Sequence, residues 1–255
     1  MRKLAVAIEL MHAATLLHDD VLDQDTLRRN ALTVNAKWGI RDAILCGDAL
    51  ASLSLYLAAD YGKEIIEIMS QTCLLLSDGE FMDVENAKQK PTESDYLETI
   101  RRKSASLFKA ATECGAMAAG ATSSEVNALA GFGESLGLAY QIKDDLQDLI
   151  TLENEAPQDV NEFRATLPII HLYKSVESDL GEALVQEIAS FRTGSSTQKR
   201  NLLNKLRKCL QDSGTIFYCT NMANSYIDSA ISDLRVLKES VYGEYLVQMA
   251  KSLRL

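Results

Sequence analysis

The sequence contains little proline and moderate glycine, with 3 and 13 of these residues in a chain of 255. Because proline and glycine are the residues that most often interrupt helices and strands, their scarcity argues against a chain of many short elements joined by tight turns. A regular alternation of apolar and polar residues, which would indicate strands, is also missing over any useful length. These absences predict an all-α protein built from long helices.

Positive charge is scarce as well. The chain carries 26 Lys and Arg against 36 Asp and Glu, which gives a formal net charge of -10. A general nucleic-acid-binding protein neutralises many phosphates with basic side chains, so this balance argues against that class. A small anionic substrate is still compatible with the composition, because a few local Lys or Arg side chains can hold it.

Several signatures of catalysis and metal binding are absent from the sequence. It has no glycine-rich phosphate loop, no nucleophilic triad and no glycine-centred calcium loop. The five cysteines, at positions 46, 73, 114, 209 and 219, lack the pair spacing of a zinc site. They are expected to be reduced thiols in a cytoplasmic protein, and no secretory signal precedes the first acidic motif.

One apolar run is long enough to raise the question of a membrane span. Residues 43–59 (AILCGDALASLSLYLAA) are apolar except for Asp48 and a few serines. A central carboxylate and many small residues disfavour a span. The run is expected to be a helix in the core or at a subunit interface instead.

Helical periodicity organises most of the remaining chain. It predicts helices over 4–22, 43–62 and 65–84, and two more that begin at the capping patterns Thr92 with Asp95 and Thr122 with Glu125. The last of these is expected to reach about residue 150, and its glycines at 131, 133 and 137 indicate close approach of a neighbouring helix. Residues 23–39 and 151–164 are expected to be polar connectors. The prediction is one domain, 1–255, folded as a helical bundle.

Two short acidic motifs share one spacing, DDVLD at 19–23 and DDLQD at 144–148. At roughly 100° per residue, positions i and i+4 of a helix lie about 40° apart, so each motif forms a carboxylate face. The residues of the two faces are Asp19, Asp20, Asp23, Asp144, Asp145 and Asp148. A solvated outer surface is the ordinary interpretation of one such face, but two matching faces in apolar sequence favour a site.

The chemistry of clustered carboxylates indicates what such a site would bind. Carboxylates raise one another's pKa unless a cation neutralises them, and Mg²⁺ prefers oxygen ligands and accepts substrate phosphates. Basic residues follow the first motif at Arg28 and Arg29, and the run from Arg101 to Lys103 precedes Ser104. Alone they would be surface charges. Beside metal-binding carboxylates, they could hold the oxygens of a diphosphate.

Five segments together resemble a known family. They are LLHDDVLDQDTLRR (16–29), GD (47–48), YLETIRRKSASLF (96–108), YQIKDDLQD (140–148) and RATLP (164–168). Their order and spacing are similar to those of the trans-prenyltransferases, or isoprenyl diphosphate synthases, over nearly the whole chain. The resemblance implies an antiparallel bundle of the isoprenoid synthase fold around a deep central cavity, in a homodimer without a membrane span.

The resemblance also implies an activity and assigns residues to it. The expected reaction joins isopentenyl diphosphate to an allylic prenyl diphosphate, with about three Mg²⁺ ions held by the aspartates of both motifs. The allylic diphosphate would be bound by Arg28, Lys103, Gln141 and Arg164, and isopentenyl diphosphate by His12 and Arg29. Lys103 and Ser104 would also lie against the carbocation, so that catalysis is electrostatic rather than covalent.

Two departures from the family pattern affect the prediction. The N-terminal helices with a Gly-Lys-x-x-Arg-Pro type motif are expected to be missing, so the chain is incomplete relative to the family. Ala14 and Thr15, just before the first motif, are small where short-chain members place an aromatic residue. A product longer than farnesyl, made by a medium- or long-chain synthase, is therefore expected.

Three alternatives compete with a prenyl elongase. A non-catalytic or regulatory subunit would account for a missing N-terminal motif, but it would not need aspartates in both motifs. A class I terpene cyclase has one aspartate-rich motif and a different second metal motif, so the repeated pentad favours elongation. A purely structural helical bundle fits the composition but leaves both acidic faces unexplained.

Overall fold

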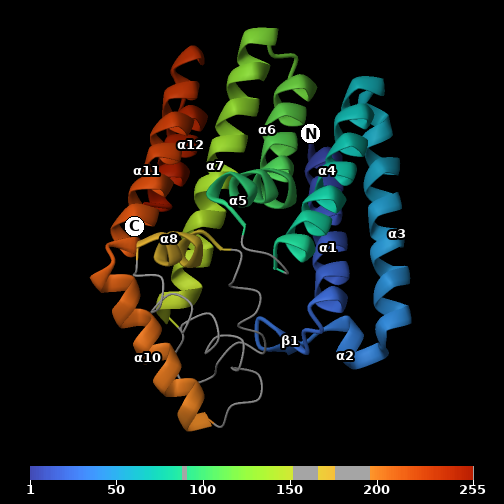
Figure 1. The fold of residues 1–255 in the computed structure, drawn as a ribbon. Helices are drawn as coiled ribbons and strands as arrows, with labels where there is room; N and C mark the ends of the chain where they lie inside the picture. Colours follow the sequence, from blue (N-terminus) through green and yellow to red (C-terminus); the bar gives the residue numbers. More distant parts are fainter. Residues whose placement is uncertain (88–90, 152–165, 176–195, 255) are drawn as a thin grey trace.

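A computed structural model describes residues 1–87, 91–151, 166–175 and 196–254, and it confirms the all-α class (Figure 1). The long helices are α1 (Arg2–Leu22), α3 (Ile40–Ala58), α4 (Lys63–Ala87), α6 (Ser106–Ala118), α7 (Ser123–Thr151), α10 (Ser196–Asp212), α11 (Thr215–Asp233) and α12 (Val241–Ser252). Shorter elements are α2 (Val34–Trp38), α5 (Glu93–Ile100), α8 (Leu167–Ser175), the 3₁₀ turns at Ala59–Tyr61 and Leu234–Val236, and a π turn at Arg101–Ala105.

Both predicted capping boxes form at helix starts. The Thr92 side chain accepts a hydrogen bond from the Asp95 backbone N–H, and the Asp95 carboxylate accepts one from the Thr92 backbone N–H at 2.8 Å. Thr122 and Glu125 make the same reciprocal pair before α7. Because the first N–H groups of a helix have no partner within the helix, these side chains fix where α5 and α7 begin.

The helices pack side by side along most of their lengths (Figure 1). α1 lies against α3, and α7 lies between α6 and α11. Buried side chains of α7 take part in core clusters with α5 and α8, with α10, and with α11 and α12, among them Phe132, Ile142, Leu146 and Leu149. The second acidic motif is therefore carried by the central helix of the bundle.

The expected close approaches around the glycines of α7 are present. A Cβ atom added at Gly133 would lie 2.3 Å from Thr112 Oγ1, and one at Gly137 would lie 2.6 Å from the Cα of Ala105. At Gly131 the close neighbour is the carboxylate of Asp233 on α11. Gly133 lets α6 pack directly against α7, and Gly137 does the same for the π turn before α6.

Two stretches differ from what the sequence predicted, and a third cannot be compared. Residues 23–39 contain a two-stranded hairpin, β1 (Leu27–Arg28) paired antiparallel with β2 (Ala31–Leu32), followed by α2. The helix expected after Thr92 is interrupted by the π turn, so it divides into α5 and α6. Residues 152–164 of the predicted second connector lie outside the described residues.

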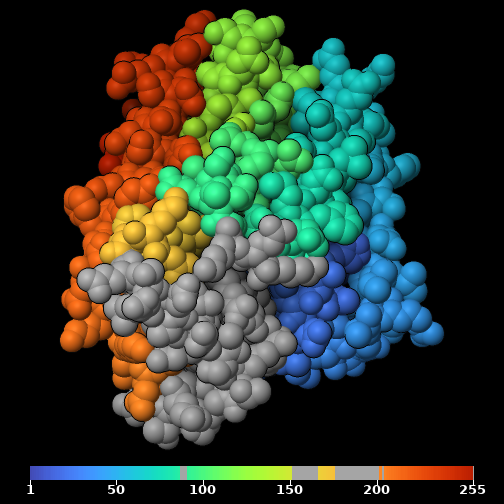
Figure 2. Space-filling view, viewed as in Figure 1, coloured from blue at the N-terminus to red at the C-terminus, as the bar shows by residue number. Residues whose placement is uncertain are grey.

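α3 is apolar but lies at the edge of the molecule rather than in its core. By length and composition, Ile40–Tyr61 is the one segment among the described residues that could cross a membrane, and 22% of its most apolar window is buried. Its exposed side chains include Ile40, Leu45, Leu53 and Tyr56. Figure 2 shows α3 and α4 forming one edge of the molecule. The expectation of a core helix is therefore wrong, and the expectation of a subunit interface is left untested.

Candidate active site

The first acidic motif occupies the last turn of α1, where Asp19 and Asp23 face a charged interior. Burial and the nearby charge of Glu80 raise the pKa of Asp19 to about 7, although Lys103 acts in the opposite direction. Burial, again opposed by Lys103, raises the pKa of Asp23 to about 6. Both carboxylates are therefore costly to ionise without a further cation, as expected of groups that are ligands for one.

Asp20 has a different environment. It is buried, and its carboxylate accepts a hydrogen bond from the Arg28 guanidinium at 2.6 Å. The hairpin that carries Arg28 turns at Arg29 and Asn30, which have φ values of 51° and 63°. Asn tolerates this left-handed region better than most residues. The turn thus directs Arg28 back onto α1, where it neutralises the middle aspartate of the motif.

The second motif lies near the end of α7 and is arranged similarly. Its middle aspartate, Asp145, accepts hydrogen bonds from the Tyr96 hydroxyl at 2.6 Å and from the Gln141 amide at 2.8 Å. Burial nevertheless raises the pKa of Asp145 to about 7. Burial also raises the pKa of Asp144 and of Asp148 above the usual range. All three carboxylates of the second motif are therefore costly to ionise, and the middle one differs from the outer two by its hydrogen bonds from Tyr96 and Gln141.

Lys103 and Ser104 lie between the two motifs. The Lys103 amino group is 2.6 Å from Asp83 and 3.0 Å from Glu80, both on α4. Burial alone would lower the pKa of Lys103, but the charges of Asp83 and Glu80 outweigh it and raise the pKa, so the ammonium stays charged. Ser104 donates a hydrogen bond to Gln141 at 2.6 Å.

Common charged neighbours link the two motifs into one site. The Asp83 charge raises the pKa of Asp23 in the first motif and of Asp145 in the second. The carboxyl ends of α1, α4 and α7, which carry these groups, point toward the same end of the bundle (Figure 1). Asp83 thus repels carboxylates of both motifs, and the ammonium of Lys103 is the cation beside it.

The donor set fits a divalent cation that keeps other ligands. Among the described residues, no three His, Cys, Asp or Glu side chains form a group that could hold a metal ion alone. Asp19 with Asp23, and Asp144 with Asp148, offer two carboxylates each. Mg²⁺ is commonly held by one or two carboxylates together with waters and substrate phosphates. The residues present therefore suit an ion that is completed by a diphosphate.

An apolar cavity of about 500 Å³ begins beside Asp19. Its lining includes Met11, Ala14, Thr15, His18 and Leu22 of α1, with Cys73, Leu76, Phe81 and Val84 of α4, and Lys103 at the charged end. At its other end the Cys73 thiol lies 3.2 Å from the Met11 sulfur. A ligand in this cavity would have an apolar tail and a charged head next to the first motif.

The structure does not bring the other predicted substrate residues together at the cavity. Arg29 is exposed and lies within electrostatic range of Tyr140 on α7. His12 is half-buried on α1, two turns before Asp19, and is not among the residues that line the cavity. Arg164 lies outside the described residues. The contacts of these three residues with a substrate stay predictions.

Sequence reasoning missed three polar residues of the site. Glu80 and Asp83 hold Lys103, and Tyr96 binds Asp145. Glu80 and Asp83 are spaced i, i+3 on α4, which places them on one helix face and was the signal that could have revealed them. Tyr96 stands on the buried face of α5, where only the fold brings it to α7.

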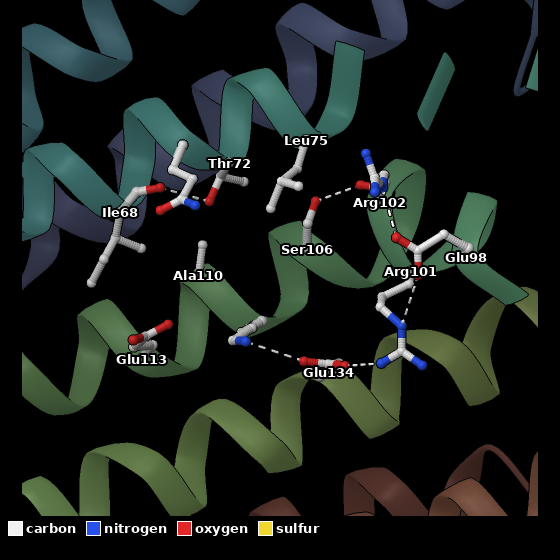
Figure 3. Close-up of a pocket in the computed structure, with 12 residues that line it drawn as sticks. Ile68, Thr72, Leu75, Glu98, Arg101, Arg102, Ser106, Ala110, Glu113 and Glu134 are labelled. Carbon is white, nitrogen blue, oxygen red and sulfur yellow. Dashed lines mark hydrogen bonds and ion pairs between the residues drawn. The ribbon is translucent and has the colours of Figure 1, made fainter. Parts of the chain in front are cut away.

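A second pocket, of about 300 Å³, lies on the other side of the π turn (Figure 3). Its cations are Arg101, Arg102 and Lys109, and each has a carboxylate partner, supplied by Glu98 or Glu134. No aspartate of either acidic motif lines this pocket, whereas the first cavity begins beside Asp19. The first cavity is the better candidate for the substrate.

Comparisons with known proteins identify relatives by sequence. Residues 1–206 match the family model described as polyprenyl synthetase. A geranylgeranyl diphosphate synthase of Methanosarcina mazei is 32% identical, with 96% of this chain and 76% of the relative covered. An octaprenyl diphosphate synthase of Escherichia coli is 31% identical, with 97% and 76% covered.

Solved structures give the same result. A decaprenyl diphosphate synthase from Rhodobacter capsulatus superposes with a TM-score of 0.90 at 30% identity, covering 98% of this chain and 78% of that one. A polyprenyl synthase from Caulobacter crescentus, complexed with calcium and isoprenyl diphosphate, superposes with a TM-score of 0.86 at 30% identity, covering 98% and 77%. The similarity thus extends over nearly all of this chain.

Proposed function

The chain belongs to the polyprenyl synthetase family, and from that membership we propose that its two acidic motifs and Lys103 form the catalytic site of a trans-prenyltransferase. The enzyme condenses isopentenyl diphosphate with an allylic prenyl diphosphate to give a longer trans-polyprenyl diphosphate. Two observations carry the proposal: the acidic motifs share the neighbour Asp83, and an apolar cavity begins beside Asp19 of the first motif.

Mg²⁺ would be held by Asp19 and Asp23 on one side and by Asp144 and Asp148 on the other. When bound, the metal supplies positive charge for the diphosphate oxygens and so favours departure of that group. The Caulobacter crescentus relative carries calcium and isoprenyl diphosphate together, which supports a divalent cation with this type of ligand. Asp20 and Asp145 would orient the helix ends, because their oxygens already accept bonds from protein donors.

The basic and polar side chains would act on the reacting groups directly. Lys103 would donate hydrogen bonds to the departing diphosphate, with Glu80 and Asp83 holding its ammonium in place. Ser104 donates its proton to Gln141, so its oxygen lone pairs are free to face the allylic cation. Arg28, on the hairpin, would hold other oxygens of the departing diphosphate, and Arg29 with His12 would hold isopentenyl diphosphate.

The cavity would receive the growing chain. Ala14 is buried in its wall and Thr15 lies beside it, so the space directly below the first motif is open. Met11 and Cys73, which touch at the far end, are the first pair able to block extension. This arrangement supports a product longer than farnesyl, as expected from the small residues before the motif.

The exposed apolar side of α3 supports assembly as a homodimer. Tyr56 is 73% exposed and Leu45 is 59% exposed, and both lie on a helix that a second copy of the chain could cover. Burial of such side chains is the usual source of stability in permanent dimers.

The function is tested by incubating the purified chain with labelled isopentenyl diphosphate and allylic primers of increasing length, with and without Mg²⁺. The dephosphorylated products are then separated by chromatography. Mg²⁺-dependent linear prenols that exceed the primer by whole isoprene units are expected. A cyclic hydrocarbon would indicate a cyclase, and turnover only after addition of another protein would indicate a regulatory subunit.

A further inference from the structure

The π turn Arg101–Ala105 carries the two residues that stand between the acidic motifs. π turns are rare and often occur at functional sites. In this turn, Lys103 reaches Glu80 and Asp83 on α4, whereas the next residue, Ser104, reaches Gln141 on α7. Two consecutive side chains are thus directed to two different helices.

The first two residues of the turn are anchored on the outer side, away from the acidic motifs. Figure 3 shows Arg101 directed to Glu134 and Arg102 directed to Glu98, across the pocket between α4 and α6. Ser106, after the turn, donates to the Arg102 carbonyl at 2.6 Å. These contacts hold the outer side of the turn but do not explain where Lys103 points.

A glycine of α4 determines the position of Lys103. A Cβ added at Gly79 would lie 2.4 Å from the backbone nitrogen of Lys103 and 2.7 Å from its Cα. Contacts this short with backbone atoms cannot be relieved by rotation of a side chain. Gly79 precedes Glu80 and stands four residues before Asp83, so the helix face that receives the Lys103 backbone also supplies one of its carboxylates.

Gly137 of α7 also lies directly against the backbone of the π turn, on the side opposite α4. A Cβ at Gly137 would lie 2.6 Å from the Cα of Ala105 and 3.0 Å from its Cβ. Gln141, the partner of Ser104, stands four residues later on the same face of α7. The turn is therefore held directly against α4 and α7 by two residues that lack side chains.

We propose that Gly79 and Gly137 are positioning residues, which hold the π turn against two helices so that Lys103 faces the diphosphate and Ser104 faces the allylic cation. The inference rests on the function proposed above. An added methyl group at Gly79 would push the Lys103 backbone away from α4 and withdraw its ammonium from the diphosphate. Gly79 itself touches no substrate, and it acts through Lys103.

The chain offers matched controls for this proposal. Gly133, also on α7, packs equally closely, but against the Phe108 carbonyl and Thr112 of α6. Gly133→Ala therefore damages helix packing without touching the π turn. Gly115 lies within α6 and has open space around its Cβ position. Gly115→Ala therefore reports the change in helix propensity alone.

The test compares Gly79→Ala and Gly133→Ala in two measurements, melting temperature and calorimetric binding of inorganic pyrophosphate with Mg²⁺. Both variants are expected to melt at lower temperature. Only Gly79→Ala is expected to weaken pyrophosphate binding, by about tenfold or more, as for loss of a charge-assisted hydrogen bond. In a Lys103→Ala background, Gly79→Ala should have little further effect on binding, because the two changes act on one interaction.

Equal loss of affinity in Gly79→Ala and Gly133→Ala would overturn the proposal, as would additive effects of Gly79→Ala and Lys103→Ala. If Gly79→Ala does not fold, Gly137→Ala tests the same turn from its contact with α7. It should weaken pyrophosphate binding several-fold, and unchanged binding would count against the proposal. A wild-type chain that binds pyrophosphate but fails to join the two prenyl substrates would refute the proposed function alone.

Discussion

Within each acidic motif, the middle aspartate differs from its neighbours. Asp20 accepts a bond from Arg28, and Asp145 accepts bonds from Tyr96 and Gln141. Among the described residues, Asp19 receives no such bond, and its pKa of about 7 reflects burial near Glu80. The sequence predicted the carboxylate faces from spacing alone. It did not predict this division of roles, because Tyr96 comes from a distant helix and Arg28 reaches Asp20 only through the hairpin.

The raised pKa of Asp19 predicts that its ionised carboxylate lowers the stability of the metal-free protein, although the proposed reaction requires it. A carboxyl whose folded pKa is about 7, against an ordinary 3.8, binds its proton more tightly in the folded state, so stability without metal falls as pH rises between these values. Asp19→Asn should therefore raise the melting temperature of metal-free protein at about pH 8 by a few degrees. It should also reduce Mg²⁺-dependent turnover by at least about a hundredfold.

Asp20→Asn is the matched comparison. It removes one charge from the buried pair with Arg28, so it should lower the melting temperature rather than raise it. Calorimetric scans in chelator at several pH values measure both changes. A lower melting temperature for Asp19→Asn at high pH would contradict the account of its environment.

Ala14 is predicted to control product length. It is 2% exposed and lines the cavity below Asp19. Phe at this position would fill the space that a growing chain needs, so Ala14→Phe should shorten the main product by one or more isoprene units. Ala5→Phe, on the exposed side of the same helix, is the control. Chromatography that shows the same product length in Ala14→Phe and wild type would contradict the prediction.

At the level of helices, the sequence predicted those elements whose start or periodicity depends on residues close together in the chain. Capping residues predicted the starts of α5 and α7, and apolar periodicity predicted α1. The π turn was not predicted, because Arg101–Ala105 continues the helical pattern and only contacts with α4 and α7 distort it. The hairpin after α1 was missed for a related reason, since it contains little β-branched sequence and turns at two non-glycine residues with positive φ.

The capping box of α5 gives a prediction for an element. Thr92→Ala removes the acceptor for the Asp95 N–H, which should lower the free energy of unfolding by about 1 kcal/mol. Ser94→Ala, at an exposed position in the same turn, should have a much smaller effect. Urea unfolding followed by circular dichroism measures both changes. Equal effects would show that the cap contributes little.

For the molecule as a whole, the exposed apolar side of α3 gives a prediction about assembly. Tyr56→Glu and Leu45→Glu would each place a charge on that surface, so they should convert a dimer to monomers. Tyr242→Glu, at a site 76% exposed on α12, should leave the dimer intact. Sedimentation equilibrium distinguishes these outcomes. A monomeric wild type would contradict the proposed assembly.

The central claim is that two acidic motifs, distant in sequence, form one diphosphate site. The most direct measurement is a double-mutant cycle on Mg²⁺-dependent binding of an unreactive allylic diphosphate analogue, using Asp19→Asn, Asp144→Asn and the variant that carries both. One shared site predicts that either single change removes most of the affinity and that the second adds little. Independent, additive losses, or equal binding without Mg²⁺, would contradict the account.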